Sequence, residues 1–274
     1  MLKADMHVHT YYSDGLFSPE EAAAEAEKNG VEFLAVTDHD NCNAYNEVKA
    51  ACSERGIKTV AGIEVSAYDG DLKVHILGYG VNPDSPSFKK FTGKLAEGSR
   101  IRAKDIITKL NESGVKVSFG DALKLSKCGV VHVMHIAQAG YLKGYGQSRF
   151  DFYHKYLVKG KCGFSNLCRP SPEDAIKAII AGGGFSSLAH PARLEIDRRE
   201  TERLIKKLKG YGLYGIEAVY TTHTNSETAY FKETAKSLDL VVTGGSDTHF
   251  KCERNAVGKP EFYLSGELAE KLGI

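Results

Sequence analysis

Short apolar runs alternate with segments of helical periodicity along most of this chain. The apolar runs predict buried strands near residues 4–9, 31–36, 57–65, 73–79, 184–189, 215–220 and 238–243. The periodic segments predict a helix at 19–29, a second that ends near residue 55, a third that begins at residue 171, and two more near 198–209 and 225–237. The first of these helices follows Ser18-Pro19-Glu20-Glu21, which supplies an N-cap serine, a proline at the first helical position and a capping-box glutamate. About seven strand–helix units without internal repeats predict an α/β fold with a closed, TIM-like barrel.

The alternation is interrupted between residues 82 and 170. Residues 87–113 carry apolar positions at helical spacing with many lysines and arginines, and shorter helical segments follow near 119–127, 132–143 and 149–158. We therefore predict a barrel built from residues 1–81 and 171–274 and a helical insertion of residues 82–170. The insertion would act as a lid or substrate subdomain over one side of the barrel.

Histidines and carboxylates close most of the apolar runs. Alternate residues of a strand share a face, so His7 and His9 should point together, away from Met6 and Val8. The carboxyl ends of barrel strands meet at one face of the barrel, so strand-end residues from distant segments should converge there. Any one of these residues has an ordinary explanation, such as a core histidine or a turn aspartate, but the joint pattern favours a metal site. The candidate metal ligands are His7, His9, Asp14, His39, Glu64, His75, His190, Asp247 and His249.

The types of these side chains indicate which ions and which ligand the site should take. Imidazoles and carboxylates without a thiolate suit zinc, manganese or iron, and nine candidates are too many for one tetrahedral ion, so two or three ions are expected. Three divalent ions would bring more positive charge than Asp14, Glu64 and Asp247 return, which favours an anionic ligand such as phosphate. Neighbouring ions would also lower the pKa of a bridging water from about 15.7 to about 7, which makes hydroxide available at neutral pH.

Composition sets limits on the class of protein. With 274 residues, 42% of them hydrophobic, the chain can bury the core of one large α/β domain with a smaller inserted lobe. Lys and Arg number 36 against 35 Asp and Glu, so a broad basic surface for long nucleic acids is not expected. This balance leaves room for a local pocket that binds a short or terminal phosphate.

Cysteine spacing and hydropathy predict the compartment. No cysteine pair forms a C-x-x-C motif, and the irregular spacing predicts ordinary reduced thiols. The first residues lack the apolar stretch of a secretory signal, and no window approaches the roughly 20 apolar residues of a membrane span. We expect a cytoplasmic protein without a membrane partner. The six cysteines are Cys42, Cys52, Cys128, Cys162, Cys168 and Cys252.

Seven motifs occur in order along the chain: His7-Val8-His9, Ser13-Asp14-Gly15, Thr37-Asp38-His39-Asp40, Gly62-Ile63-Glu64, His75-Ile76-Leu77-Gly78, Ala189-His190-Pro191 and Ser246-Asp247-Thr248-His249. They resemble the ordered motifs of the PHP (polymerase and histidinol phosphatase) superfamily over nearly the whole chain. The resemblance implies a distorted (β/α)7 barrel with a trinuclear centre of manganese, iron or zinc at the carboxyl ends of the strands. One ion would take His7, His9, Glu64 and Asp247, a second Glu64, His75 and His190, and a third Asp14, His39 and His249, with Glu64 as a bridge.

Within this superfamily, the insertion and the stretch from Lys155 to Lys161 resemble nucleotide-directed phosphoesterases. These include nucleoside 3',5'-bisphosphate phosphatases and 5'-3' exoribonucleases. The resemblance implies that Arg193 clamps a phosphate and that His223 faces the substrate. An arginine at position 193 could also form a surface salt bridge. His135 is retained in the insertion without the arginines that surround it in such relatives, so a second phosphate would be held differently. Lys161, or the lysines at 155 and 159, could compensate unless they are simply solvated.

The expected function is hydrolysis of a phosphomonoester, with a nucleotide or nucleoside bisphosphate as the small phosphorylated substrate. A metal-bridging hydroxide would attack phosphorus in line at a centre that includes Asp14, His39, Glu64 and Asp247, and no protein nucleophile is needed. His223 or His135 would be the candidate general acid. Three alternatives remain: a 5'-3' or 3'-5' exonuclease on short single strands, a histidinol phosphatase, and a non-catalytic sensor of a phosphorylated ligand.

Overall fold

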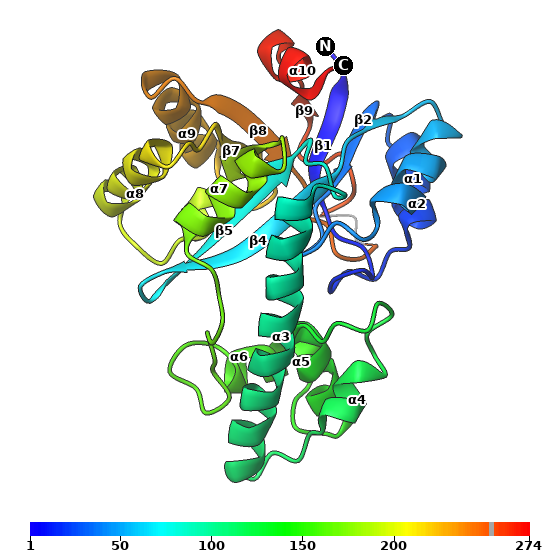
Figure 1. Cartoon of the computed structure of the whole chain (residues 1–274), viewed down its shortest axis with the longest axis vertical. Helices are drawn as coiled ribbons and strands as arrows, with labels where there is room; N and C mark the ends of the chain where they lie inside the picture. The colour runs from blue at the N-terminus through cyan, green and yellow to red at the C-terminus, as the bar shows by residue number, and fades with distance from the viewer. Residues whose placement is uncertain (252–254) are drawn as a thin grey trace.

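The strands of this protein lie in two hydrogen-bonded sheets within a mixed α/β fold (Figure 1). The structure is a computed structural model that describes residues 1–251 and 255–274. The first sheet has the order β3-β2-β1-β9, with β3 at Lys58–Thr59, β2 at Phe33–Val36, β1 at Lys3–Val8 and β9 at Phe262–Tyr263. The second has the order β4-β5-β6-β7-β8, with β4 at Gly62–Asp69, β5 at Leu72–Tyr79, β6 at Phe185–Leu188, β7 at Gly215–Tyr220 and β8 at Val241–Gly245.

The strand directions depart from a uniform parallel barrel. Strand β5 is antiparallel to both β4 and β6, because only Gly70 and Asp71 separate β4 from β5 and a parallel pairing would need a much longer crossover. The two sheets approach each other through isolated bridges between Val8 and Thr248 and between His39 and Glu64. The predicted α/β class is confirmed, and the described strands form two separate ladders rather than one continuous closed ladder.

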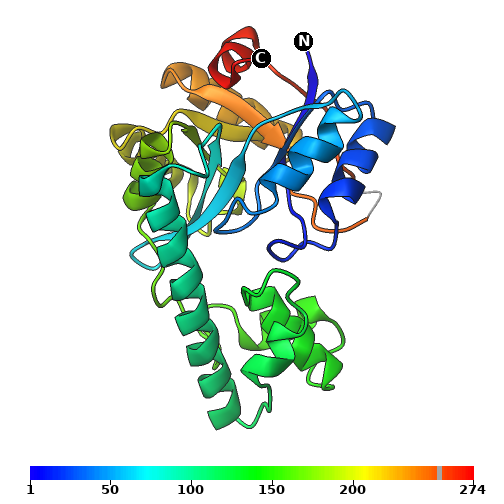
Figure 2. The same ribbon diagram turned by 45° about the vertical axis from the view of Figure 1, so that its right-hand side comes forward.

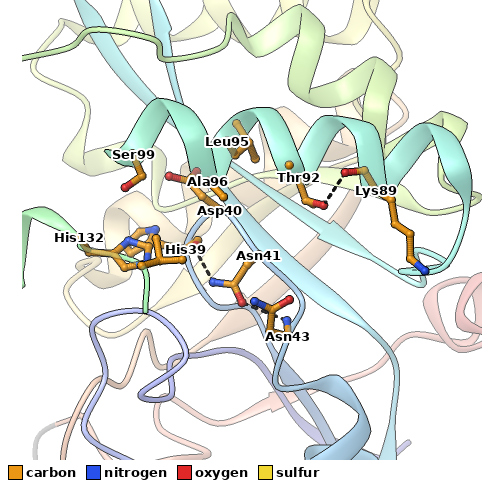
Figure 3. A pocket seen from close by; sticks show the side chains of 12 residues that line it. His39, Asp40, Asn41, Asn43, Lys89, Thr92, Leu95, Ala96, Ser99 and His132 are labelled. Carbon is orange, nitrogen blue, oxygen red and sulfur yellow. Dashed lines mark hydrogen bonds between the residues drawn. The ribbon is translucent and has the colours of Figure 1, made fainter. Parts of the chain in front are cut away.

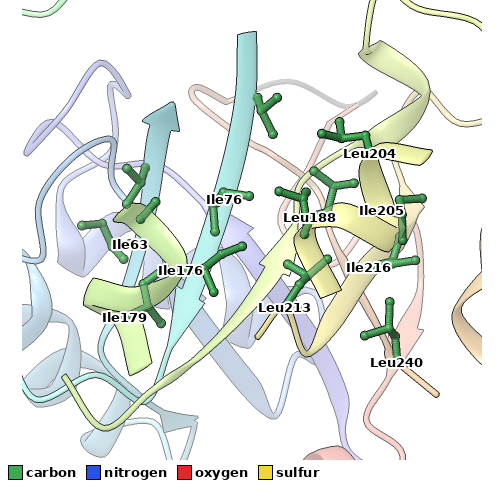
Figure 4. Packing of buried hydrophobic residues seen from close by; sticks show 14 of the residues in the cluster. Ile63, Ile76, Ile176, Ile179, Leu188, Leu204, Ile205, Leu213, Ile216 and Leu240 are labelled. Carbon is green, nitrogen blue, oxygen red and sulfur yellow. The ribbon is translucent and has the colours of Figure 1, made fainter. Parts of the chain in front are cut away.

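Helices cover the outer faces of the strands close to the predicted positions. Figure 4 shows Ile63, Ile76 and Ile216 of the second sheet meeting isoleucines and leucines of the helices in one buried cluster. Strand β9 and the last helix were not predicted, and both lie in the final 13 residues. The helices around the sheets are α1 (Pro19–Lys28), α2 (Tyr45–Ser53), α7 (Pro172–Ala181), α8 (Arg198–Gly210), α9 (Asn225–Ser237) and α10 (Gly266–Leu272), with a 3-10 turn, η1, at Pro191–Arg193.

Residues 82–170 contain four helices close to the predicted ranges and extend away from the sheets (Figures 1 and 2). The long helix α3 joins the two parts, because Phe88 belongs to the buried cluster of the second sheet while Leu110 belongs to a separate cluster in the insertion. This second cluster also includes the fully buried Phe152. The helices of the insertion are α3 (Pro86–Glu112), α4 (Phe119–Leu123), α5 (Val133–Leu142) and α6 (Arg149–Tyr156). None of the described helices is long and apolar enough to cross a membrane.

Candidate metal centre

The nine predicted ligand residues come together at one place, although they lie up to 242 positions apart in the chain. His7 and His9 come from the end of β1, Glu64 from β4 and His75 from β5. The other five lie on the loops that follow β1, β2, β6 and β8: Asp14, His39, His190, Asp247 and His249. Chains of short contacts through Glu64, Asp14 and Asp247 connect all nine side chains.

Four donor atoms of this cluster form a tetrahedron. The Nε2 atoms of His7 and His9 lie 3.1 Å apart, and each lies 3.2–3.4 Å from Glu64 Oε2 and 3.3–3.4 Å from Asp247 Oδ1. An ideal tetrahedron has an edge about 1.63 times its centre-to-corner distance, so ligands about 2.0–2.1 Å from a zinc ion lie about 3.3–3.4 Å apart. These five of the six distances between the four donor atoms therefore fit a four-coordinate ion.

Glu64 lies at the centre of the cluster and uses both of its oxygens. Oε2 faces His7, His9 and His39 Nδ1, the last at 3.0 Å. Oε1 lies 2.7 Å from His75 Nδ1 and 3.1 Å from His190 Nε2. A carboxylate with a separate set of imidazoles on each oxygen is suited to bridge two ions.

A further group of donors surrounds Asp14. Its Oδ1 lies 3.3 Å from His249 Nε2 and 4.0 Å from His39 Nε2, and the rings of His9 and His249 stack with centroids 4.1 Å apart. His9, Asp14, His39 and His249 together form a group that could hold a metal ion, so His9 reaches this position as well as the tetrahedral one. His39, Glu64 and His75 form a third such group.

Unpaired buried atoms within the cluster also fit bound cations. Asp14 Oδ1 and His39 Nδ1 are buried and form no hydrogen bond of suitable geometry with a described residue, although each lies close to another candidate ligand. Leaving such polar atoms unpaired in a protein interior is costly unless an ion or another group satisfies them.

The surroundings of the cluster favour the ionised form of its carboxylates. Burial alone would raise the pKa of Asp14, but the imidazoles of His249 and His39 outweigh it and hold the pKa well below its usual range. The same balance, with His75 and His39 for Glu64 and with His7 and His249 for Asp247, lowers the pKa of both carboxyl groups. Burial lowers the pKa of His75 well below its ordinary value and favours the neutral imidazole that a metal requires.

A second layer of carboxylates orients the ligands. Glu217 on β7 is fully buried, and its Oε1 lies 2.9 Å from His7 Nδ1 while its Oε2 accepts a hydrogen bond from the backbone N–H of His190. Asp5 accepts hydrogen bonds from the backbone N–H groups of His7 and Ser246. With Nδ1 of His7 held by Glu217, Nε2 of this ring is the atom presented to the cluster.

The backbone around the ligands is unusual at several positions. His190 and Asp247 have positive φ angles of 28° and 53°, which cost free energy in non-glycine residues and occur mainly at functional sites. Gly245, just before the Asp247 motif, allows β8 to approach β1, because a Cβ at Gly245 would lie 2.4 Å from His7 Cβ. This close approach brings Asp247 to the two histidines of β1.

The four predicted substrate residues lie in different surroundings. Arg193 Nη1 lies 3.3 Å from Asp247 Oδ2 and donates a hydrogen bond of 2.8 Å to Tyr220 Oη, so it borders the cluster. His135 is buried and lines a pocket together with Asp14. His223 engages backbone groups through both ring nitrogens, Nδ1 with Ala218 O and Nε2 with Ala192 N. Lys161 is exposed, and its side chain forms no hydrogen bond or ion pair with the described residues of the cluster.

Tyr220 and Glu217 are residues that sequence reasoning missed. Tyr220 Oη donates to Asp247 Oδ2 at 2.7 Å, and the neighbouring carboxylate and burial raise the pKa of this phenol far above its usual range. The available signal was the strand at 215–220, in which Glu217 is an isolated carboxylate among apolar residues. A charged residue inside a buried strand needs a partner, and the strand alone does not reveal which one.

Asp40 connects the centre to the insertion. It is buried next to His39, and its Oδ2 lies 2.6 Å from Arg169 Nη1 and 4.0 Å from Arg102 Nη2 on α3. Burial would raise the pKa of Asp40, but the two guanidinium groups lower it below its usual value. Asp40 and His39 also line a pocket of about 220 Å³, together with His132 of the insertion (Figure 3).

The cysteines take no part in the cluster among the described residues. Cys42, Cys52, Cys128, Cys162 and Cys168 are unpaired. Cys252, which the sequence interpretation also treated as a reduced thiol, lies outside the described residues.

Comparison with known proteins gives consistent family relationships and differing activities. The family described as "PHP domain" matches residues 5–215. The chain is 32% identical to a 3',5'-nucleoside bisphosphate phosphatase of Chromobacterium violaceum, over 91% of this chain and 88% of that protein. It is also 32% identical to a phosphoribosyl 1,2-cyclic phosphate 1,2-diphosphodiesterase of Eggerthella lenta (91% and 95%) and 30% identical to a 5'-3' exoribonuclease of Haemophilus influenzae (94% and 93%).

Solved structures support the same fold along the whole chain. A Chromobacterium violaceum protein described as an amidohydrolase with bound sulfate superposes with a TM-score of 0.89 at 30% identity, and the match covers 98% of this chain and 96% of that one. A protein of Bifidobacterium adolescentis described as a metal-dependent phosphoesterase gives a TM-score of 0.86 at 26% identity, with the same coverage.

Proposed function

We propose that this protein releases phosphate from a small phosphomonoester, either a nucleotide or a nucleoside bisphosphate. The chain belongs to the PHP domain family and is a metal-dependent phosphoric ester hydrolase. The observation that carries the proposal is the convergence of six imidazoles and three carboxylates around Glu64. Such a donor set is far larger than one structural ion needs, and it has the ligand types of catalytic zinc, manganese and iron sites.

Three divalent ions of manganese, iron or zinc are the proposed cofactors. The ligand sets are His7, His9, Glu64 and Asp247; Glu64, His75 and His190; and Asp14, His39 and His249. When bound, such ions would supply positive charge for the phosphoryl oxygens and would acidify a coordinated water. The tetrahedral spacing of the first set and the unpaired oxygen of Asp14 support this assignment.

Around the centre, residues of this chain are suited to orient a phosphate ester. Arg193 borders Asp247 and can donate two parallel hydrogen bonds to phosphoryl oxygens. Tyr220 bonds to both Arg193 and Asp247, so it holds the guanidinium at the rim of the cluster. His223 is proposed as a positioning residue of the turn that carries Arg193, because both of its ring nitrogens engage backbone groups. His135 is proposed as a substrate contact, because it lines the pocket beside Asp14.

A second phosphate, where the substrate has one, would find positive charge on another side of the centre. Arg169 lies against Ser66, the direct cross-strand neighbour of His75. Lys73 lies two residues before His75 and therefore on the same face of β5. Lys161 is the remaining candidate, and its exposed position supports a weaker contribution.

The finer description of the fold is also a proposal. We infer that the two sheets are the halves of a distorted, TIM-like (β/α)7 barrel with residues 82–170 inserted as a separate subdomain. The bridges Val8–Thr248 and His39–Glu64 support this description, since they connect β1 with the loop after β8 and the loop after β2 with β4.

The test is a product analysis on metal-loaded protein. Substrates should include nucleoside 3',5'-bisphosphates, nucleoside 5'-monophosphates, ribose 5-phosphate, histidinol phosphate, a cyclic phosphate and a short 5'-phosphorylated RNA. Inorganic phosphate released from the nucleotides is the expected result. Mononucleotides released from the RNA would instead identify an exoribonuclease, and binding without turnover of any substrate would identify a sensor. Release of phosphate from histidinol phosphate alone would also contradict the proposal.

A further inference from the structure

A cavity of about 410 Å³ opens beside Asp14 and leads away from the metal centre toward the insertion. We propose that this cavity binds the nucleobase of the substrate, an assignment that rests on the proposed phosphatase function. Its volume lies within the range of roughly 300–1,000 Å³ that is usual for small-molecule sites. Its walls come from the loop after β1, from α5 and α6 of the insertion, and from Phe250 after β8.

The walls of this base pocket are aromatic and apolar. The rings of Phe150 and Phe250 lie 6.3 Å apart, and the Arg149 guanidinium covers both, at 5.0 Å and 5.6 Å from their centroids. Phe150 is 46% exposed and Leu16 is 62% exposed, so large apolar groups at the pocket face solvent. A planar base laid against them would remove this surface from water and stack on the rings and the guanidinium.

Polar groups in the same pocket suit the edge of a base. Gln138 on α5 lines the pocket and offers both a donor and an acceptor through its amide. The backbone N–H of His132 donates to Nδ1 of His135, so a neutral His135 ring carries its proton on Nε2. A heteroaromatic base with ring nitrogens and exocyclic groups matches such partners better than a phenyl ring does.

The charges of the pocket indicate which aromatic ligand it favours. Lys127 lies 5.0 Å from the Tyr11 ring and Arg149 lies over the two phenylalanines, so two cations border the cavity. These cations repel the ammonium and imidazolium groups of an amino-alcohol phosphate such as histidinol phosphate. They attract an uncharged base that carries a phosphate on its sugar, and Asp14 connects the pocket to the centre where that phosphate would react.

The experiment compares a nucleotide with the same phosphate lacking a base. For the metal-loaded parent protein, kcat/KM is measured with adenosine 5'-monophosphate and with ribose 5-phosphate, and the measurement is repeated for Phe150→Ala and Gln138→Leu. Stacking of one base corresponds to about 5–150-fold in affinity, so the parent should prefer the nucleotide by a factor in this range. Phe150→Ala and Gln138→Leu should each lose most of that preference through KM and leave the rate with ribose 5-phosphate unchanged.

Leu142→Ala is the matched control, because Leu142 is a large exposed apolar residue of the same insertion that does not line the pocket. Equal kcat/KM for the two substrates in the parent, or an unchanged preference in both pocket variants, would overturn the base pocket while leaving the phosphatase intact. A parent that releases phosphate from neither substrate, and from no nucleoside 3',5'-bisphosphate either, would overturn the proposed function instead. Equilibrium dialysis with adenosine then tests the pocket alone, and binding that is equal in parent and Phe150→Ala overturns it.

Discussion

The two parts of this protein contribute different kinds of residue to the site. All nine candidate metal ligands come from the two sheets and their loops, outside residues 82–170. The insertion contributes His135, Arg149 and Phe150, which border the centre without entering it. Metal binding requires donor atoms that are positioned within tenths of an ångström, and packed strands can hold them there. Substrate selection depends on surface residues, which can differ from one relative to the next.

This division offers an account of why relatives of similar identity carry three different activities. A phosphatase, a cyclic phosphodiesterase and an exoribonuclease all match this chain at 30–32% identity over most of its length. In this chain the centre is built on strands and their loops, and we expect the residues around it to decide which phosphate ester reaches it. The predictions below test this division.

The largest effect should follow from removing a ligand of the centre. His39→Ala takes away a ring that faces both Asp14 and Glu64, so we expect a loss of phosphate release well beyond the about 10–100-fold typical of outer residues. Metal content should fall as well, which elemental analysis of the purified variant measures. His154→Ala, an exposed histidine on α6, is the control. Full activity in His39→Ala would contradict the assignment of the centre.

The next effect concerns Asp40, which joins the two parts. Asp40→Asn leaves Arg169 and Arg102 without their carboxylate, and removing one partner of a buried ion pair costs about 3–5 kcal/mol. Urea unfolding of the whole protein measures this loss. Asp71→Asn is the control, since Asp71 also spans the two parts, through Lys159 at 3.2 Å, but is exposed. Equal stability of the two variants would mean that the insertion is not anchored through Asp40.

A moderate effect is expected for the layer behind the ligands. Glu217→Gln keeps the size of the side chain but removes the charge that holds His7 Nδ1, so metal affinity or kcat should fall by about 10–100-fold. A metal titration of the apo variant distinguishes the two possibilities. The surface substitution Glu267→Gln serves as the comparison. An unchanged titration together with unchanged turnover would exclude an orienting role for Glu217.

The smallest effect should be that of Arg193→Lys. Lysine keeps the positive charge but loses the planar fork, and one charge-assisted hydrogen bond of about 1.5 kcal/mol corresponds to about tenfold in kcat/KM. Steady-state kinetics with a nucleotide substrate measures the change, with Arg198→Lys on the exposed face of α8 as the reference. A variant with parental kcat/KM would show that Arg193 serves only its contacts with Tyr220 and Asp247.

Sequence periodicity predicted the elements well and their directions less well. The capping box at Ser18 begins α1 as predicted, and Ser171, Asp197 and Thr224 begin other helices in the same way. The hairpin between β4 and β5 was read as part of a uniform barrel, because an apolar run has the same period whether its strand is parallel or antiparallel. The short β9 was missed because two residues carry no measurable period.

The sequence by itself determined the donor types of this protein and their positions at the ends of buried runs. Side chains alternate between the two faces of a strand, so His7 and His9 of β1 point to the same face. Burying a histidine or a carboxylate without a partner costs free energy, so these residue types at the ends of buried runs indicate a site. Only the tertiary structure decided the spacing of the donors, the central position of Glu64, the support from Glu217 and Tyr220, and the pocket between Asp14 and the insertion. Each of these depends on contacts between segments far apart in the chain, and local patterns carry no information about such distances.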